Sequence, residues 1–397
     1  MNVALKYSPS VVKRLTDTCY LLRDHFEMDV KEGESSKSAE SSVNVAISDE
    51  EKAIYDRQIR LWGFEAQNRL RNSSVLIAGL SGCGAEVAKN LMLAGLKSVT
   101  ENDESNQFLI APGSIGQNRA EASRSRCHVL NPHVALHVDT SDIANKHDDF
   151  FKQFDLVVLI DQKYSTVAKI DKICRAAHIG FVAGGVFGWT GYGFFDFNEH
   201  IFLLKPRKVV MTMFSDEDGP SEEQPSPAKK ARGNVGNVDV AQAGGQNQEI
   251  IDIGEDDEER VETKFHFASW EETMNVDWTQ KKLIRKSKRL IPSCYFPIRA
   301  LLRAYDSHDE VDLEFILKLW KEELESCNHR FDMQPLEESD SVFFTDPPFG
   351  PACAIVGAMV AQEAIKALSQ NDEPLRNLFL YSALETAGFV CNFPPIV

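Results

Sequence analysis

An arginine-bearing segment and a glycine-rich turn are the parts of this sequence whose residue types could do chemistry. The segment reads Tyr55-Asp-Arg-Gln-Ile-Arg-Leu-Trp-Gly63, and shortly after it comes the turn Gly79-Leu-Ser-Gly-Cys-Gly84. Glycines let a backbone approach a phosphate closely, and the first N–H groups of a following helix favour an anion. An arginine helix that leads into such a turn therefore indicates nucleotide chemistry.

The elements around the turn are those of a dinucleotide-type fold. The turn follows the apolar run Val75-Leu-Ile-Ala-Gly79, which predicts a buried strand. It precedes residues 85–94, in which Val87, Leu91 and Ala94 share one helical face. Gly95 is the expected end of that helix.

The spacing of the glycines departs from the dehydrogenase pattern. Gly79, Gly82 and Gly84 are the candidate cofactor-binding residues, in the order G-x-x-G-x-G. Nicotinamide-binding folds commonly show G-x-G-x-x-G, with an acid about 20 residues later. Glu101 or Asp103 could be that acid, so a dehydrogenase stays open at this point. Short glycine motifs also occur in plain tight connections.

Strands and helices alternate from residue 49 onward, which predicts an α/β protein with a mainly parallel sheet. A second ordered block shows helical spacing over residues 313–324, and a core helix is expected at about 352–369. The expected strands lie at 75–79, near Ser98, and at 134–138, 156–160, 181–184, 201–204 and 378–381.

Acidic charge is concentrated in one segment. The chain has a net charge of −17, and residues 215–262 hold 14 Asp or Glu against 4 Lys or Arg. No aromatic residue lies between Phe214 and Phe265, so we expect a disordered insertion. Its basic cluster, Pro227–Arg232, fits either a nuclear import signal or a solvated charge run. The acidic balance argues against nucleic-acid binding, which needs clustered Lys and Arg.

Neither a membrane span nor a zinc site is expected. The longest strongly apolar run, Pro351–Ala361, is shorter than the roughly 18 to 20 residues of a spanning helix. Glu363 and Lys366 follow it, so it predicts a buried core helix. The eight cysteines include no C-x-x-C pair, which indicates reduced thiols in an intracellular chain and no structural zinc.

Three histidines and one cysteine lack the pattern of a reactive site. His133 and His137 fall on the polar face of the strand at 134–138, and with His128 they form no evident tetrahedral set. Cys174 lies on the apolar face of a predicted helix, which favours a packing role. No metal site is therefore predicted.

Together, the motifs over residues 48–390 resemble the ubiquitin-activating and ThiF-like superfamily. They are similar to those of the small subunits of SUMO-activating enzymes, which carry no catalytic cysteine. The residues that carry the resemblance are Tyr55–Gly63, Gly79–Glu86, Gln107–Ile110, Gly116–Ser123, Asn131-Pro132, Val186–Gly188 and Ala352–Ser369.

The resemblance implies a Rossmann-like adenylation domain of the ThiF type. The segments it implies are a flexible N-terminal extension (1–48), the first part of the adenylation-type domain (49–214), the disordered acidic insertion (215–262), a smaller ordered block (263–340) and a return to the adenylation-type domain (341–397).

It also implies a heterodimer with a large subunit that carries the catalytic cysteine. ATP and Mg²⁺ are then bound mainly by that partner. The C-terminal glycine of a SUMO-type modifier is adenylated and passed to the partner's cysteine. The expected location is the nucleus, with the cytoplasm left open.

The resemblance also predicts an incomplete set of ATP ligands in this chain. The ATP-binding half of such pairs shows an Asn-Arg-Gln-Phe-Leu-Phe run and then a Gly-x-x-Lys-Ala segment. Here Asn106–Ile110 lacks the arginine, and Arg119 stands in place of the lysine. Asp161 matches a Mg²⁺-binding aspartate of the family, but without those partners a loop-capping role is favoured.

Arg57 is the residue through which this chain is expected to act on ATP. In the family, the arginine of the Tyr-Asp-Arg-Gln motif reaches the partner's nucleotide. A guanidinium supplied in trans neutralises the charge of the departing pyrophosphate. The alternative is that Arg57 pairs with an acid on its own helix.

The sequence departs from the family pattern at one link. The link over residues 99–108 is shorter than in the family, which predicts a truncated second strand or a lost exon.

Three other functions stay open from the sequence. The nearest alternative is the small subunit that activates the cullin-modifying ubiquitin-like protein, which usually has a longer inserted helical domain. A homodimeric adenylyltransferase of the sulfur-transfer type would need the full ATP-ligand set. The dehydrogenase is the most distant alternative.

Overall fold

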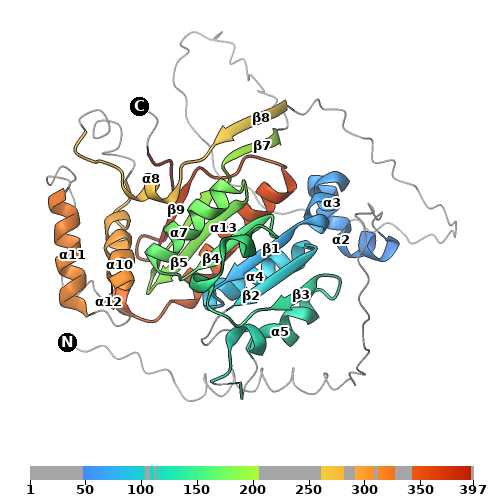
Figure 1. Cartoon of the computed structure of the whole chain (residues 1–397), viewed down its shortest axis with the longest axis horizontal. Coiled ribbons are helices and arrows are strands. Elements are labelled where there is room, and N and C mark those ends of the chain that lie inside the picture. The colour runs from blue at the N-terminus through green and yellow to red at the C-terminus, as the bar shows by residue number, and fades with distance from the viewer. Residues whose placement is uncertain are drawn as a thin grey trace, which may run out of the picture. The chain divides into compact units, whose positions relative to one another are not determined.

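An eight-stranded sheet forms the centre of the structure. The computed structural model describes residues 48–102, 108–110, 113–114, 116–204, 261–280, 291–307, 312–326 and 342–394. The strand order is β10-β9-β6-β5-β4-β1-β2-β3 (Figure 1). The strands are β1 (Ser74–Ala78), β2 (Ser98–Asn102), β3 (Ala135–Val138), β4 (Leu156–Ile160), β5 (Gly180–Phe187), β6 (Thr190–Asp196), β9 (Leu378–Ser382) and β10 (Ala387–Cys391).

The part of the sheet from β3 to β5 is parallel, which confirms the predicted α/β class. Strands β6, β9 and β10 extend it with antiparallel pairings. Strand β2 pairs with β1 over all five of its residues, so the second strand is not truncated. Strand β5 runs past the expected end at Gly184 because it forms a hairpin with β6.

Helices cover both faces of the sheet, and the central strand β4 contributes side chains to the hydrophobic core on each face. In β4, Leu156, Val158 and Ile160 lie in the core beneath α4 (Gly82–Ala94) and α13 (Gly350–Ser369). Val157 and Leu159 lie in the core beneath α7 (Tyr164–Ala176). This alternation follows from the period of two in a strand, and it explains why β4 is apolar throughout.

The smaller ordered block shares the core on the α7 side. Its described helices are α8 (Trp270–Met274), α10 (Tyr295–Ser307) and α11 (Leu313–Ser326), and α12 (Val342–Thr345) follows at the start of the return segment. Trp270 is fully buried, and its ring lies 5.2 Å from that of Phe194 in β6. Leu319 and Leu324 of α11 belong to the same hydrophobic cluster as Val157 of β4. The block and the sheet therefore stabilise each other.

A two-stranded hairpin brackets the acidic insertion. It consists of β7 (Glu199–Leu204) and β8 (Val261–His266), which pair antiparallel. The boundary expected at residue 262 needs correction, because Val261 and Glu262 already belong to β8. The extended pairing with β7 supplies the hydrogen bonds that order them. The remaining residues of the expected insertion, and the extension before Ser48, lie outside the described residues.

Among the described residues, α13 is the one helix long and apolar enough to cross a membrane by length and composition. It packs instead against α4, β5 and β6, with Val356 and Val360 fully buried. Gly357 permits this crossing, since a Cβ there would lie 2.6 Å from the Glu86 Cβ. The predicted core helix is thus confirmed.

Candidate functional site

The arginine segment forms helix α2 (Asp49–Trp62), which begins with a capping box. The Ser48 hydroxyl accepts from the Glu51 N–H at 3.2 Å, and the Glu51 carboxylate accepts from the Ser48 N–H at 3.0 Å. Glu51 also forms an ion pair, at 2.9 Å, with Arg71 of the next helix, α3 (Phe64–Asn72). These contacts join the beginning of α2 to the end of α3.

Arg57 is exposed on α2, and no described acidic side chain neutralises its charge. Within the described part of the chain, its guanidinium has no hydrogen bond or ion pair. The neighbouring Arg60 differs, because it pairs with Asp56 at 3.1 Å one turn earlier. Arg57 therefore does not pair with a described acid on its own helix.

Arg57 lies within an apolar stripe. Ile54 and Leu61 are three residues before and four residues after it, so all three share one face of α2. Ile54 is 56% exposed and Leu61 is 73% exposed. Further exposed apolar side chains are Leu93 on α4 and Ile355 on α13. Large apolar side chains in water on neighbouring helices mark an interaction surface.

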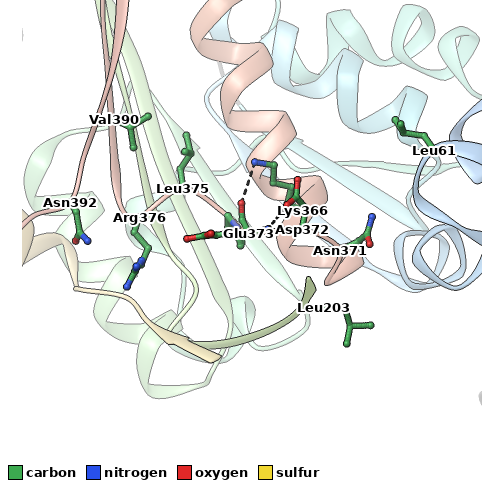
Figure 2. A pocket seen from close by; sticks show the side chains of 11 residues that line it. Leu61, Leu203, Lys366, Asn371, Asp372, Glu373, Leu375, Arg376, Val390 and Asn392 are labelled. Carbon is green, nitrogen blue, oxygen red and sulfur yellow. Dashed lines mark hydrogen bonds between the residues drawn. The ribbon is translucent and has the colours of Figure 1, made fainter. Parts of the chain in front are cut away.

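Two pockets flank this stripe. One, of about 590 Å³, lies between α2, α4 and α13, with Leu61, Leu93 and Ile365 on its wall. The other, of about 640 Å³, lies at the end of α13, where Lys366 donates to the Glu373 carbonyl at 3.3 Å (Figure 2). Leu61 and Lys366 line both pockets, so the stripe borders a hollowed surface.

The glycine turn is shaped by its own packing. A Cβ at Gly79, where φ is +101°, would lie 1.9 Å from the Ile160 carbonyl oxygen, and one at Gly84 would lie 1.9 Å from the Gly79 oxygen. At Gly82, a Cβ would meet the Cys353 Sγ at 3.3 Å. Gly79 and Gly84 are thus required by the fold, whether or not a phosphate is bound.

A pocket of about 390 Å³ lies where β4 and β5 end, beside this turn. Among the described residues of its lining, Arg119 and Lys163 are the cations and Asp161 and Asp346 are the carboxylates, so these side chains together carry no net positive charge. One of the first donors of α4 is also taken, because the Gly84 N–H donates to the Ser81 hydroxyl at 3.4 Å. The described lining therefore offers no excess of positive charge to a triphosphate.

Aromatic rings and a strained aspartate complete this pocket. Phe187 stacks on Tyr305 with ring centroids 5.6 Å apart. Asp161 has a positive φ of 52°, its N–H donates to the Gly184 carbonyl at 2.9 Å, and its Oδ1 accepts from the Val186 N–H at 3.1 Å. This carboxylate therefore ties the end of β4 to β5.

The other candidate residues do not gather into a site. His133 and His137 are exposed beside β3, and no group of three metal-ligating side chains occurs among the described residues. Burial raises the pKa of the Cys174 thiol, and Cys174 is part of the core. The side chains of Glu101, Asp103 and Asn106 lie outside the described part.

The sequence pattern of the ThiF family matches residues 55–394. The chain belongs to the ThiF family. It is 37% identical to SUMO-activating enzyme subunit aos-1 of Caenorhabditis elegans over 369 residues, which cover 88% of this chain and 99% of that protein. It is 39% identical to SUMO-activating enzyme subunit 1 of Rattus norvegicus over 371 residues (89% and 97%) and to that of Homo sapiens over 361 residues (87% and 95%).

These relatives confirm the family predicted from the motifs. The chain is a homologue of SUMO-activating enzyme subunit 1, with an adenylation fold of the ThiF type. They favour SUMO activation over the cullin-modifier, sulfur-transfer and dehydrogenase alternatives.

Proposed function

We propose that this ThiF protein is the small subunit of a heterodimeric SUMO-activating enzyme and supplies Arg57 to the partner's nucleotide. The large subunit holds most of the ligands of ATP and Mg²⁺, and it carries the cysteine that receives the adenylated modifier. The observation that carries the proposal is an exposed arginine, without an ion-pair partner in the described part, on a helix that is held at its first turn by Glu51 and further along by Tyr55 and Gln58.

The chemistry calls for such a group. Formation of an acyl-adenylate expels pyrophosphate, and negative charge grows on the departing phosphates. A guanidinium neutralises that charge with two parallel N–H donors and stays protonated at every physiological pH. Its effect is largest in a closed, water-poor interface. An arginine already bound to a neighbouring carboxylate would first have to break that pair.

The apolar stripe supports the delivery of Arg57 to a partner. Ile54 and Leu61 flank Arg57 on the same face of α2, so a partner that covers them also meets the guanidinium. The pocket between α2, α4 and α13 is suited to an apolar side chain of the partner, because Leu61, Leu93 and Ile365 line it. The large subunit is the proposed occupant.

The lining of the strand-end pocket supports the same division of labour. Its described residues carry no net positive charge for a triphosphate, although the turn and the sheet of a nucleotide-binding fold are kept. A nuclear location is proposed with the function, on the basis of the basic cluster Pro227–Arg232, which lies outside the described residues.

The test is ATP–pyrophosphate exchange in the presence of a SUMO-type modifier. We expect activity from the mixture of this chain with a large subunit and none from this chain alone. In the mixture, Arg57→Ala should lower kcat/KM by about 10³-fold while the heterodimer still forms, as for other arginines supplied in trans. Arg60→Ala is the matched control, because it removes an exposed guanidinium one turn away that already has a partner.

Two results would contradict the proposal. Exchange by this chain alone would mean that it carries a complete ATP site. Normal exchange by Arg57→Ala in the mixture would mean that the partner's nucleotide does not depend on this residue.

A further inference from the structure

Three side-chain amides cover the carboxyl end of helix α4. The last carbonyls of a helix have no partner within it. Here the Asn131 Nδ2 donates to the Met92 carbonyl at 2.8 Å, and the Gln58 Nε2 donates to the Leu93 carbonyl at 3.0 Å. The Gln67 Nε2 donates to the Ala94 carbonyl at 2.9 Å. Helices α2 and α3 are thereby attached to the end of α4.

Asn131 makes a second bond that reaches α2 directly. Its Nδ2 also donates to the Tyr55 hydroxyl at 2.7 Å, in a contact that is buried. Tyr55 is only 3% exposed, and its ring lies against Gly95, the left-handed residue that ends α4. A Cβ at Gly95 would lie 2.5 Å from the Tyr55 Cζ. The tyrosine therefore fills a space that the glycine leaves.

These contacts fix the rotation of α2 about its own axis. Tyr55 and Gln58 are three residues apart, so both anchors lie on the inner side of the helix. Arg57 is two residues from Tyr55, about 200° around the helix, and it points outward. We infer that Tyr55 and Asn131 are positioning residues for Arg57, because their hydrogen bond sets the direction in which the guanidinium leaves the helix.

This inference rests on the proposed function, and the geometry of the helix gives the size of the expected effect on the rate. An α-helix with side chains is about 10 to 12 Å across, so a rotation of about 10° moves a group on its surface by about 1 Å. A displacement of about 1 Å in a catalytic arrangement costs up to about 10²-fold in rate. Loss of the Tyr55–Asn131 bond should therefore slow adenylation by about tenfold and leave the heterodimer intact.

The test is a double-mutant cycle between Tyr55→Phe and Arg57→Ala, measured by pyrophosphate exchange with the large subunit and a SUMO-type modifier. Tyr55→Phe keeps the ring and deletes the hydroxyl. We expect a loss of about tenfold in kcat/KM in the wild-type background, and a loss below about twofold once Arg57 is alanine. Asn131→Leu, which removes the amide donor at similar size and leaves the Tyr55 hydroxyl no polar group at this position, should show the same dependence on Arg57.

Thr273→Val is the matched control for a merely structural effect. The Asn377 Nδ2 donates to the Thr273 hydroxyl at 2.6 Å and to the Phe393 carbonyl at 2.7 Å, so this buried site repeats the Asn131 arrangement far from α2. Loss of the Thr273 hydroxyl should lower Tm by about as much as Tyr55→Phe does. It should leave pyrophosphate exchange unchanged, both with Arg57 and with Arg57→Ala.

The outcomes separate the two claims. If Tyr55→Phe lowers exchange equally with and without Arg57, or if Thr273→Val lowers it as much, the positioning role is overturned and the proposed function stands. If Arg57→Ala has no effect, both are overturned.

Discussion

A buried carboxyl pair should make the stability of this chain fall as the pH rises. Asp171 of α7 and Asp196 at the end of β6 are each 1% exposed. Burial, and then the neighbouring Asp196 carboxylate, raise the pKa of Asp171 to about 7. Arg175 pairs with Asp196, and the Trp270 N–H donates to Asp171 at 2.9 Å. We predict that Asp171→Asn removes this pH dependence.

The sign follows from proton binding. An unfolded aspartate has a pKa of about 3.9, so between about pH 4 and pH 7 the folded chain holds a proton that the unfolded chain has released. The contribution of this proton to the free energy of unfolding is fully present below the unfolded pKa, and it is lost as the pH rises through the folded pKa. The loss is about 1.4 kcal/mol per pH unit, or roughly 3 kcal/mol between pH 5 and pH 7.

The assay is urea unfolding of the wild type and of Asp171→Asn from about pH 5 to about pH 8. The asparagine keeps an oxygen for the Trp270 N–H and carries no proton to lose. Its stability relative to the wild type should therefore increase by roughly 3 kcal/mol across the range. The control is Asp277→Asn: hydrogen bonds from Thr279 lower the pKa of Asp277, so this carboxyl is ionised in both the folded and the unfolded chain across the range, and its difference from the wild type should stay constant. A difference between wild type and Asp171→Asn that is constant with pH would refute the reasoning.

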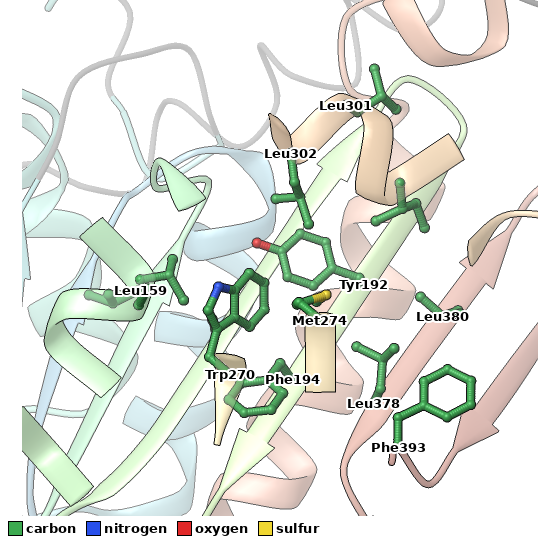
Figure 3. Packing of buried hydrophobic residues seen from close by; sticks show 14 of the residues in the cluster. Leu159, Tyr192, Phe194, Trp270, Met274, Leu301, Leu302, Leu378, Leu380 and Phe393 are labelled. Atoms are coloured by element: carbon green, nitrogen blue, oxygen red, sulfur yellow. The ribbon is translucent and has the colours of Figure 1, made fainter. Parts of the chain in front are cut away.

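Two further predictions concern the core. Burial lowers the pKa of His200 to about 4, so the folded chain resists protonation of this imidazole. The free energy of unfolding should therefore fall by up to about 3 kcal/mol as the pH falls from about 6.5 to about 4. His200→Phe should abolish that fall when unfolding is measured in urea. Trp270 lies among Tyr192, Phe194 and Met274 (Figure 3), so Trp270→Ala should lower the free energy of unfolding by about 3 to 5 kcal/mol, and a change below about 1 kcal/mol would mean that this cluster does not anchor α8.

The sequence predicts those parts of the fold that local patterns determine. The apolar run Leu156–Ile160 predicts a strand buried on both faces, and the structure gives β4 with cores on either side. The helical spacing around Leu313 and Leu324 predicts α11 in the same way. Such patterns follow from the period of an element, so they need no knowledge of distant contacts.

Contacts between distant residues cannot be read from those patterns. Asn131 stands in the sequence as part of an Asn-Pro pair, and nothing local shows that its amide will join the Tyr55 hydroxyl 76 residues away. Asp171 lies on a helix whose buried face is otherwise apolar, and its partner Asp196 belongs to another element. Polar groups of this kind are satisfied by tertiary packing, which a single sequence does not display.

The glycine turn shows that packing alone can require the residues of a ligand-binding motif. A Cβ at Gly79 or Gly84 would lie 1.9 Å from a backbone oxygen, so neither position accepts a side chain even when no phosphate is bound. A charged residue such as Arg119, which begins α5 (Arg119–Leu130) and lies outside the turn, is under no such constraint. The glycines are therefore expected whether or not the chain binds ATP itself. For such a chain, the informative residue is an exposed arginine without a described partner on a helix that the fold holds in place.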